Sequence, residues 1–199
     1  MNLPNKLTLS RFAFTVWFLV AMFSGMPYCE TVALAFFVAA GISDFLDGSI
    51  ARRRNLITNF GILMDPLADK IMICSAFIAF VELGWFAAWM AVIVVARELA
   101  ITGLRLLAAS KNVVLAAESW GKHKTISQIV AVIAIFIDQI MRKDQWGPIG
   151  QAIFGWHLFD QHSWSWWVAE IFKWLSVVLT FYSGSMYLWK NRALYLDDM

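Results

Sequence analysis

The chain contains two apolar stretches with embedded acidic residues: TVALAFFVAAGISDFLDGSIARR at residues 31–53 and GILMDPLADKIMICSAFIAFVE at residues 61–82. Each stretch is long and apolar enough to cross a bilayer as a helix. A carboxylate in hydrocarbon is costly unless it is paired, protonated or bound to a cation. The acidic residues of these stretches therefore predict a functional site, formed by Asp44, Asp47, Asp65 and Asp69.

The spacing of the four aspartates suits a metal site. Asp44 and Asp47 are three residues apart and Asp65 and Asp69 are four apart, so each pair lies on one face of a helix. Carboxylate oxygens suit Mg²⁺, Mn²⁺ or Ca²⁺ better than zinc. The alternative, neutralisation by nearby Arg and Lys without a metal, would bury much charge for little stabilisation. We therefore expect a divalent-cation site.

The composition predicts an integral membrane protein with an all-α, polytopic fold. The 199 residues are 60% hydrophobic and 15% charged, which is too apolar for a soluble domain of this size. We found no linker or internal repeat, so residues 1–199 are expected to form a single domain. The segment NLPNKLTLSRF at residues 2–12 predicts a short interfacial helix leading into the first span, or simply a basic anchor. Six transmembrane helices are expected, at about residues 7–25, 31–50, 62–82, 85–107, 125–141 and 165–188.

The basic residues predict the orientation. Six spans place both termini on one side, and that side carries most of the Lys and Arg, which indicates the cytoplasm. The opposite loops offer only Arg142 and Lys143. The net charge of +2 is small for a nucleic-acid binder, so no nucleic-acid partner is expected. The residues of the basic side are Lys6, Arg11, Arg52, Arg53, Arg54, Lys111, Lys122, Lys124, Lys190 and Arg192.

Two further features carry no predicted chemistry. Cys29 and Cys74 fall near an outer loop and inside the third span, so we expect two inert thiols rather than a disulfide. The outer stretch 142–164 is rich in tryptophan, which is typical of an aromatic belt at a membrane boundary. We assign no function to this stretch.

A second cluster of polar residues lies on the fourth and fifth spans. It comprises ARELAITGLR at residues 96–105 and GKHKT at residues 121–125. Arg97 and Arg105 are eight residues apart and lie near one face of a helix, with Glu98 and Thr102 beside them. Basic side chains that face an acidic metal site predict a pocket for an anionic second substrate, such as a phosphate monoester. A snorkelling role would fit Lys122 well, but it fits the mid-span Arg97 poorly.

The acidic stretches together read D-x-x-D-G-x-x-A-R, then eight residues, then G-x-x-x-D-x-x-x-D. This string resembles the signature of the CDP-alcohol phosphotransferases. The resemblance implies that Asp44, Asp47 and Asp65 bind metal, and that Asp69 both contacts metal and acts as general base. Two ions, Mg²⁺ or Mn²⁺, are implied. The CDP group is implied to bind at Asp44, Asp47, Gly48, Ala51, Arg52 and Gly61.

Over roughly residues 1–130 the chain resembles the family members that use sn-glycerol 3-phosphate as acceptor. The implied reaction transfers a phosphatidyl group from CDP-diacylglycerol to that acceptor and releases CMP. The resemblance also implies a homodimer, amid the lipids of a bacterial inner membrane, with the active site facing the cytoplasm. The acceptor phosphate is expected at Arg97, Arg105, Lys122, Lys124 and Thr125, with Glu98, Thr102, Asn5, Thr8 and Arg11 in support.

Two alternatives remain open. A member of the same family with another acceptor, such as inositol phosphate, serine or a diglyceride, would share the aspartates. A divalent-cation transporter would instead use the aspartates as a conduction site. Channels repeat acidic rings along a pore, whereas these carboxylates cluster toward one membrane side beside basic residues.

Overall fold

The computed structural model describes residues 3–54, 59–111, 113, 115, 120–154, 157–159 and 162–196. Within these ranges, some side chains lie outside the described part, namely those of residues 3–8, 44–54, 59–63, 65, 66, 69, 120–122, 157–159, 162 and 196.

Six long helices form within the described residues, at the places where the sequence predicts six apolar runs. The structure extends most of them beyond those runs, because polar residues at the ends continue the helical backbone. The helices are α1 (Leu3–Phe23), α2 (Cys29–Arg54), α3 (Asn59–Glu82), α4 (Ala88–Ser110), α5 (Trp120–Arg142) and α7 (Trp164–Lys190). A single turn, α8 (Ala193–Leu196), follows α7.

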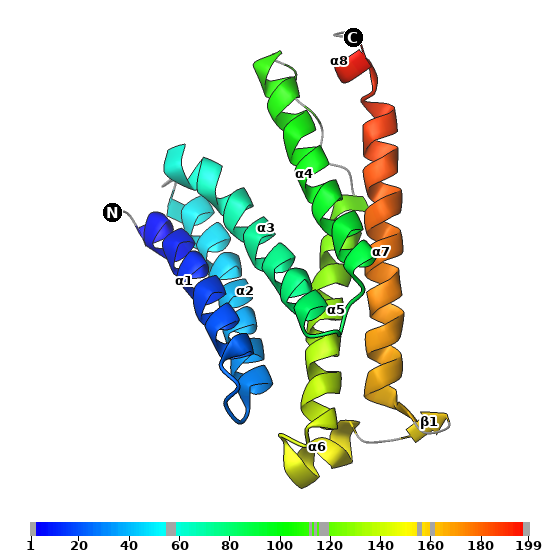
Figure 1. Cartoon of the computed structure of the whole chain (residues 1–199). Coiled ribbons are helices and arrows are strands. Elements are labelled where there is room, and N and C mark those ends of the chain that lie inside the picture. The colour runs from blue at the N-terminus through cyan, green and yellow to red at the C-terminus, as the bar shows by residue number, and fades with distance from the viewer. Residues whose placement is uncertain are drawn as a thin grey trace.

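The long helices form two groups that meet toward one end and splay apart toward the other (Figure 1). One group contains α1, α2 and α3, and the other contains α4, α5 and α7. The two chain termini lie at the splayed end, which we call the terminal end, and α6 lies at the opposite end, the loop end (Figure 1). The two termini therefore lie at the same end of the bundle (Figure 1), and their placement on one side of a membrane stays a prediction.

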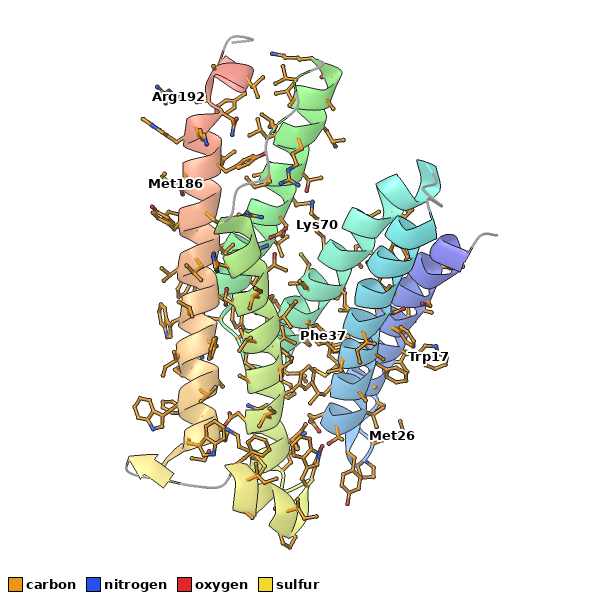
Figure 2. The ribbon with its side chains drawn as sticks, turned by 180° about the vertical axis from the view of Figure 1, so that it is seen from behind. Trp17, Met26, Phe37, Lys70, Met186 and Arg192 are labelled. Carbon is orange, nitrogen blue, oxygen red and sulfur yellow. The ribbon has the colours of Figure 1, made fainter. Side chains whose placement is uncertain are left out.

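The core lies where α1, α3 and α5 approach one another. The ring of Phe136 on α5 contacts those of Phe18 and Phe80, with centroid distances of 6.0 and 5.1 Å. Fully buried alanines, including Ala33 and Ala76, let the helix backbones pack closely around these rings. Large apolar side chains also cover the outside of the bundle, as Trp17 does on the outer face of α1 (Figure 2).

A tight turn ends α3 before α4 begins. Gly84 has φ of 74°, a left-handed conformation that glycine adopts without strain. The backbone N–H of Trp85 then donates to the carbonyl of Phe80 at 2.8 Å. This turn sets α4 back from the loop end of α5 (Figure 1).

The structure adds elements that the sequence did not predict within the stretch 142–164. A short helix, α6 (Gly147–Phe154), is followed by a two-stranded antiparallel hairpin of β1 (His157–Phe159) and β2 (His162–Ser163). The rest of the described fold is helical, as predicted. The two cysteines are free, which agrees with the prediction of no disulfide.

The amino-terminal segment differs from its prediction. Helix α1 runs without a break from Leu3, so residues 3–12 are its first turns rather than a separate interfacial helix. Among the described residues, His123–Arg142 is the one helical stretch with the length and apolar composition of a full membrane span. Leu9–Phe23 and Cys29–Ser43 are shorter apolar helical stretches.

Candidate active site

The backbone of the aspartate motif is helical. Asp44 and Asp47 lie on α2, and Asp65 and Asp69 lie on α3. A spacing of three or four residues on a helix places each pair on one face, which is the premise of the predicted metal site. The described side chains contain no group of three or more His, Cys, Asp or Glu that could hold a metal ion. The four aspartate side chains lie outside that set.

Other predicted site residues also have side chains outside the described part, so their roles stay predictions. Arg11, by contrast, is described and buried on α1. This part of α1 contacts α2, the helix that carries Asp44 and Asp47, since the hydroxyls of Ser10 and Ser43 lie 3.3 Å apart. The residues whose backbone is described but whose side chains are not are Asn5, Thr8, Gly48, Ala51, Arg52, Gly61 and Lys122.

The second predicted cluster comes together around a buried carboxylate. Glu98 on α4 is 7% exposed and Lys124 on α5 is 3% exposed. The ammonium of Lys124 donates to Oε1 of Glu98, and Nη1 of Arg97 donates to the same oxygen at 3.3 Å. A buried carboxylate needs such partners to offset its desolvation. Glu98 therefore holds two cationic side chains in place in the interior.

Arg97 keeps unused hydrogen-bonding capacity. Among the described residues, no partner accepts a hydrogen bond from its buried Nε. A buried guanidinium group with an unpaired N–H favours binding of an anion. Arg97 lines an apolar cavity of about 280 Å³ between α4 and α7, together with residues such as Ala100 and Gly184.

Gly184 on α7 makes room for Arg97. A Cβ atom at position 184 would lie 2.7 Å from Cγ of Arg97, which is closer than real carbon contacts allow. The sequence analysis missed Gly184, because a lone glycine in an apolar helix gives no sign of its distant neighbour.

Lys70 links the aspartate helix to this cluster. Its ammonium donates to Oγ1 of Thr102, and that hydroxyl donates in turn to the backbone carbonyl of Glu98 at 2.7 Å. Figure 2 labels Lys70 on α3. The sequence analysis missed Lys70, although its place directly after Asp69 was an available signal. The link joins α3 to α4 one residue beyond the predicted base.

Arg105 lies apart from the buried cluster. It is exposed, and its guanidinium carbon lies 5.8 Å from the centre of the Tyr187 ring on α7. Eight residues of helix separate it from Arg97, a rise of about 12 Å. Thr125 is half-buried beside Lys124 on α5. The structure thus gathers Arg97, Glu98, Thr102 and Lys124, and places Arg105 nearer the terminal end.

Comparisons with known proteins agree with the motif. Residues 1–182 match the CDP-alcohol phosphatidyltransferase family. The chain is 34% identical over 202 residues to the CDP-diacylglycerol–glycerol-3-phosphate 3-phosphatidyltransferase of Bacillus subtilis, covering 96% of this chain and 95% of that protein. It is 30% identical over 186 residues to a protein of the same name from Rickettsia bellii, covering 94% and 93%. A probable phosphatidylglycerophosphate synthase of Mycobacterium tuberculosis is 42% identical over 135 residues, covering 66% and 64%.

Proposed function

Because the chain belongs to the CDP-alcohol phosphatidyltransferase family, we propose that it transfers the phosphatidyl group of CDP-diacylglycerol to the 1-hydroxyl of sn-glycerol 3-phosphate. The products are phosphatidylglycerophosphate and CMP. Two relatives that align over almost their whole length are named for this reaction. The structural observation that carries the choice of acceptor is the cationic pair of the partly buried Arg97 and the buried Lys124, because an anionic acceptor needs such a site.

The proposal places the protein in a membrane, with six spans formed by the long helices. These helices carry many exposed large apolar side chains, and exposed apolar surface of this extent is typical of contact with lipid. The cytoplasmic face is proposed to be the terminal end, in a bacterial inner membrane. Strongly exposed apolar residues include Val92, Leu99, Leu106, Ile126, Phe181 and Trp189.

The donor is proposed to bind at the aspartate motif. Asp44, Asp47, Asp65 and Asp69 would hold divalent ions, Mg²⁺ or Mn²⁺, through an all-oxygen ligand set that these cations prefer. Such ions, when bound, screen the diphosphate and the developing charge on the departing CMP. The CDP group is proposed to lie against the small residues Gly48 and Ala51 and near Arg52 and Gly61.

The acceptor is proposed to bind between the two clusters. Its phosphate pairs with Arg97 and Lys124, supported by Arg105, Lys122 and Thr125. Its hydroxyl reaches Asp69, which takes the proton as the hydroxyl oxygen attacks the donor phosphorus. Support comes from the link between Lys70 and Thr102, since it ties the helix that carries Asp69 to the helix that carries Arg97.

Some of the rival acceptors of the same family, such as a diglyceride or serine, carry no phosphate for this pocket to bind. An uncharged acceptor such as a diglyceride would leave the two cations with the single carboxylate of Glu98 between them, and the cluster would keep an excess positive charge. Transport of a divalent cation is also disfavoured, because the described basic cluster would repel the ion.

The test is CMP release by purified protein from CDP-diacylglycerol with Mg²⁺ or Mn²⁺. Four acceptors are compared, namely sn-glycerol 3-phosphate, inositol 1-phosphate, serine and diacylglycerol. Release with sn-glycerol 3-phosphate alone is expected. Release with inositol 1-phosphate would change the acceptor but keep the phosphate pocket. Release with serine or diacylglycerol would contradict that pocket but keep the aspartate chemistry, and no release with any acceptor would contradict the enzymatic proposal.

Asp69→Asn is expected to abolish turnover, because an amide cannot accept the proton of the attacking hydroxyl. CMP release should fall by at least about a hundredfold, the usual size of a general-base contribution. Asp144→Asn is the matched control, since Asp144 is an exposed carboxylate at the loop end. Full activity in Asp69→Asn would remove this residue as the base.

A further inference from the structure

A polar cavity, distinct from the apolar cavity beside Arg97, lies away from the proposed active site. It has a volume of about 290 Å³ and lies between α5 and α7, toward the loop end. The turn between α3 and α4 contributes Gly84 and Trp85 to its lining. Its polar lining residues are Asp138, Gln139, Arg142, Glu170 and Lys173, and Trp85 and Trp166 complete the wall.

Asp138 is the unusual member of this lining. It is 4% exposed, and its Oδ2 accepts a hydrogen bond from Nε of Arg142 at 2.8 Å. Among the described residues, its other oxygen, Oδ1, is buried without a hydrogen-bond partner. The hydroxyl of Ser165 interacts with this carboxylate and also lies 2.8 Å from the hydroxyl of Ser163, but it makes no hydrogen bond of normal geometry to Oδ1. An unpaired buried carboxylate oxygen is costly and calls for a donor.

The other charges of the cavity are arranged around this oxygen. Glu170 is already satisfied, because Lys173 pairs with its Oε2 and the indole N–H of Trp174 donates to its Oε1 at 2.9 Å. Arg142 is about half exposed, and its bond to Asp138 uses Nε, so the rest of the guanidinium group can bind an anion. The cavity therefore offers a carboxylate acceptor beside a guanidinium donor.

From this arrangement we infer that the cavity binds a phospholipid headgroup that joins a phosphate to a primary ammonium, the chemistry of phosphatidylethanolamine. The ammonium donates to Oδ1 of Asp138, and the phosphate accepts from Arg142. A quaternary ammonium such as choline has no N–H to donate, so it would leave Oδ1 unpaired.

The position of the cavity selects a lipid over a soluble molecule. Asp138 lies about one helical turn inside the end of α5, the depth at which headgroups meet the ends of spanning helices. The tryptophans of the wall are the residue type found at that boundary. This inference rests on the membrane placement proposed above, but not on the proposed reaction.

The test measures lipid retention by native mass spectrometry. The purified full chain is loaded with equal amounts of phosphatidylethanolamine, phosphatidylcholine and phosphatidylglycerol of identical acyl chains. We expect phosphatidylethanolamine to be retained in preference to the other two. Asp138→Asn should reduce that preference by about tenfold or more, the size expected when a charge-assisted hydrogen bond is lost. Asp144→Asn, a change of the same chemistry at an exposed position, should not alter retention.

Three results would overturn the inference. Equal retention of the ethanolamine and choline lipids would show that no donated hydrogen bond is recognised. Preferred retention of phosphatidylglycerol would show that the ammonium is not recognised, and an unchanged preference in Asp138→Asn would show that the lipid binds elsewhere. If Asp138→Asn does not fold, Arg142→Gln at the half-exposed partner replaces it. This change removes the donor to the phosphate that all three lipids share, so it should lower the retention of phosphatidylethanolamine, and unchanged retention would overturn the inference. CMP release measured on the same samples separates these outcomes from a failure of the proposed reaction.

Discussion

At the scale of single residues, the position of Arg97 depends on the neighbouring residue of α7 being a glycine, Gly184, which has no side chain. Gly184 allows the aliphatic part of Arg97 to pass close to the backbone of α7. The head of Arg97 then reaches Glu98, whose carboxylate also pairs with Lys124. A glycine thus fixes the geometry of a charged cluster with which it makes no hydrogen bond.

Gly184→Ala is therefore expected to displace Arg97 and weaken acceptor binding. Overpacking of this kind costs about 1–3 kcal/mol, so KM for sn-glycerol 3-phosphate should rise several-fold while KM for CDP-diacylglycerol stays nearly constant. The control is Gly103→Ala on α4, because a Cβ there meets no atom within 4 Å. An unchanged KM for the acceptor in Gly184→Ala would show that Arg97 does not bind it.

At the scale of helices, hydrogen bonds between neighbouring elements connect the two halves of the proposed site. Lys70 of α3 and Thr102 of α4 form such a link. The Thr102 hydroxyl has one proton, which it gives to the carbonyl of Glu98, so its lone pairs are available to Lys70. The link joins α3, the helix that carries Asp65 and Asp69, to the helix of the proposed acceptor pocket.

Thr102→Val should lower kcat, because it removes the acceptor for Lys70 while keeping the shape of the side chain. A decrease of about tenfold is expected if the link contributes the energy of a charged hydrogen bond. Thr102→Ser keeps the hydroxyl and should retain most of the activity. Equal activity of the two variants in the CMP-release assay would count against a positioning role for this link.

A second link joins helices at the loop end, outside the proposed spans. Glu30 at the start of α2 accepts hydrogen bonds from Lys143 and Gln145, which follow α5. Burial by itself raises the pKa of the Glu30 carboxyl, but hydrogen bonds from Lys143, Cys29 and Gln145 outweigh it and lower the pKa below its ordinary value. The bond to Glu30 raises the pKa of Lys143.

These shifts predict how the link depends on pH. A lowered carboxyl pKa stabilises the fold above the ordinary value of 4.5, and this contribution is lost as the pH falls below it. The raised pKa of Lys143 stabilises the fold below its ordinary value of 10.5 and is lost above it. Glu30→Gln should thus lower Tm by about 2–4 °C near neutral pH.

The difference in Tm between the native chain and Glu30→Gln should shrink toward pH 3, where the carboxyl becomes protonated. Glu82→Gln is the control, because Glu82 is an exposed carboxylate at the end of α3. A Tm difference that persists at pH 3 would mean that the shape of the Glu30 side chain, rather than its charge, stabilises the link.

At the scale of the whole molecule, the arrangement predicts a definite orientation in the membrane. Both termini lie at one end of the bundle, and α6 lies at the other (Figure 1). Lys111, at the end of α4, and Asp144, after α5, are both exposed. In the proposed topology, Lys111 faces the cytoplasm and Asp144 faces the opposite side.

Single-cysteine labelling of intact cells tests this orientation, in a background where Cys29 and Cys74 are replaced by serine. A membrane-impermeant maleimide should label Asp144→Cys in intact cells but label Lys111→Cys only after lysis. The reverse pattern would invert the topology, and labelling of both positions in intact cells would contradict the membrane placement.

The helices could be predicted from the sequence because their physical cause is local. A run of about 20 apolar residues satisfies its backbone hydrogen bonds internally and forms a helix whatever surrounds it. The aspartate motif could likewise be recognised from the sequence, because it is defined by the spacing of residues along one segment. The match of residues 1–182 to the family agrees with it. The hairpin after α6 was not predicted, because its two short strands show no alternating pattern.

What the sequence determined by itself is therefore the set of helices, the family motif and the residue types of the proposed acceptor pocket. Which side chains meet was decided by tertiary structure alone. The pairing of Glu98 with Lys124, the link from Lys70 to Thr102 and the contact of Gly184 with Arg97 each join different helices. Their cause is the packing of one helix against another, and a linear pattern does not encode that packing at any fixed spacing.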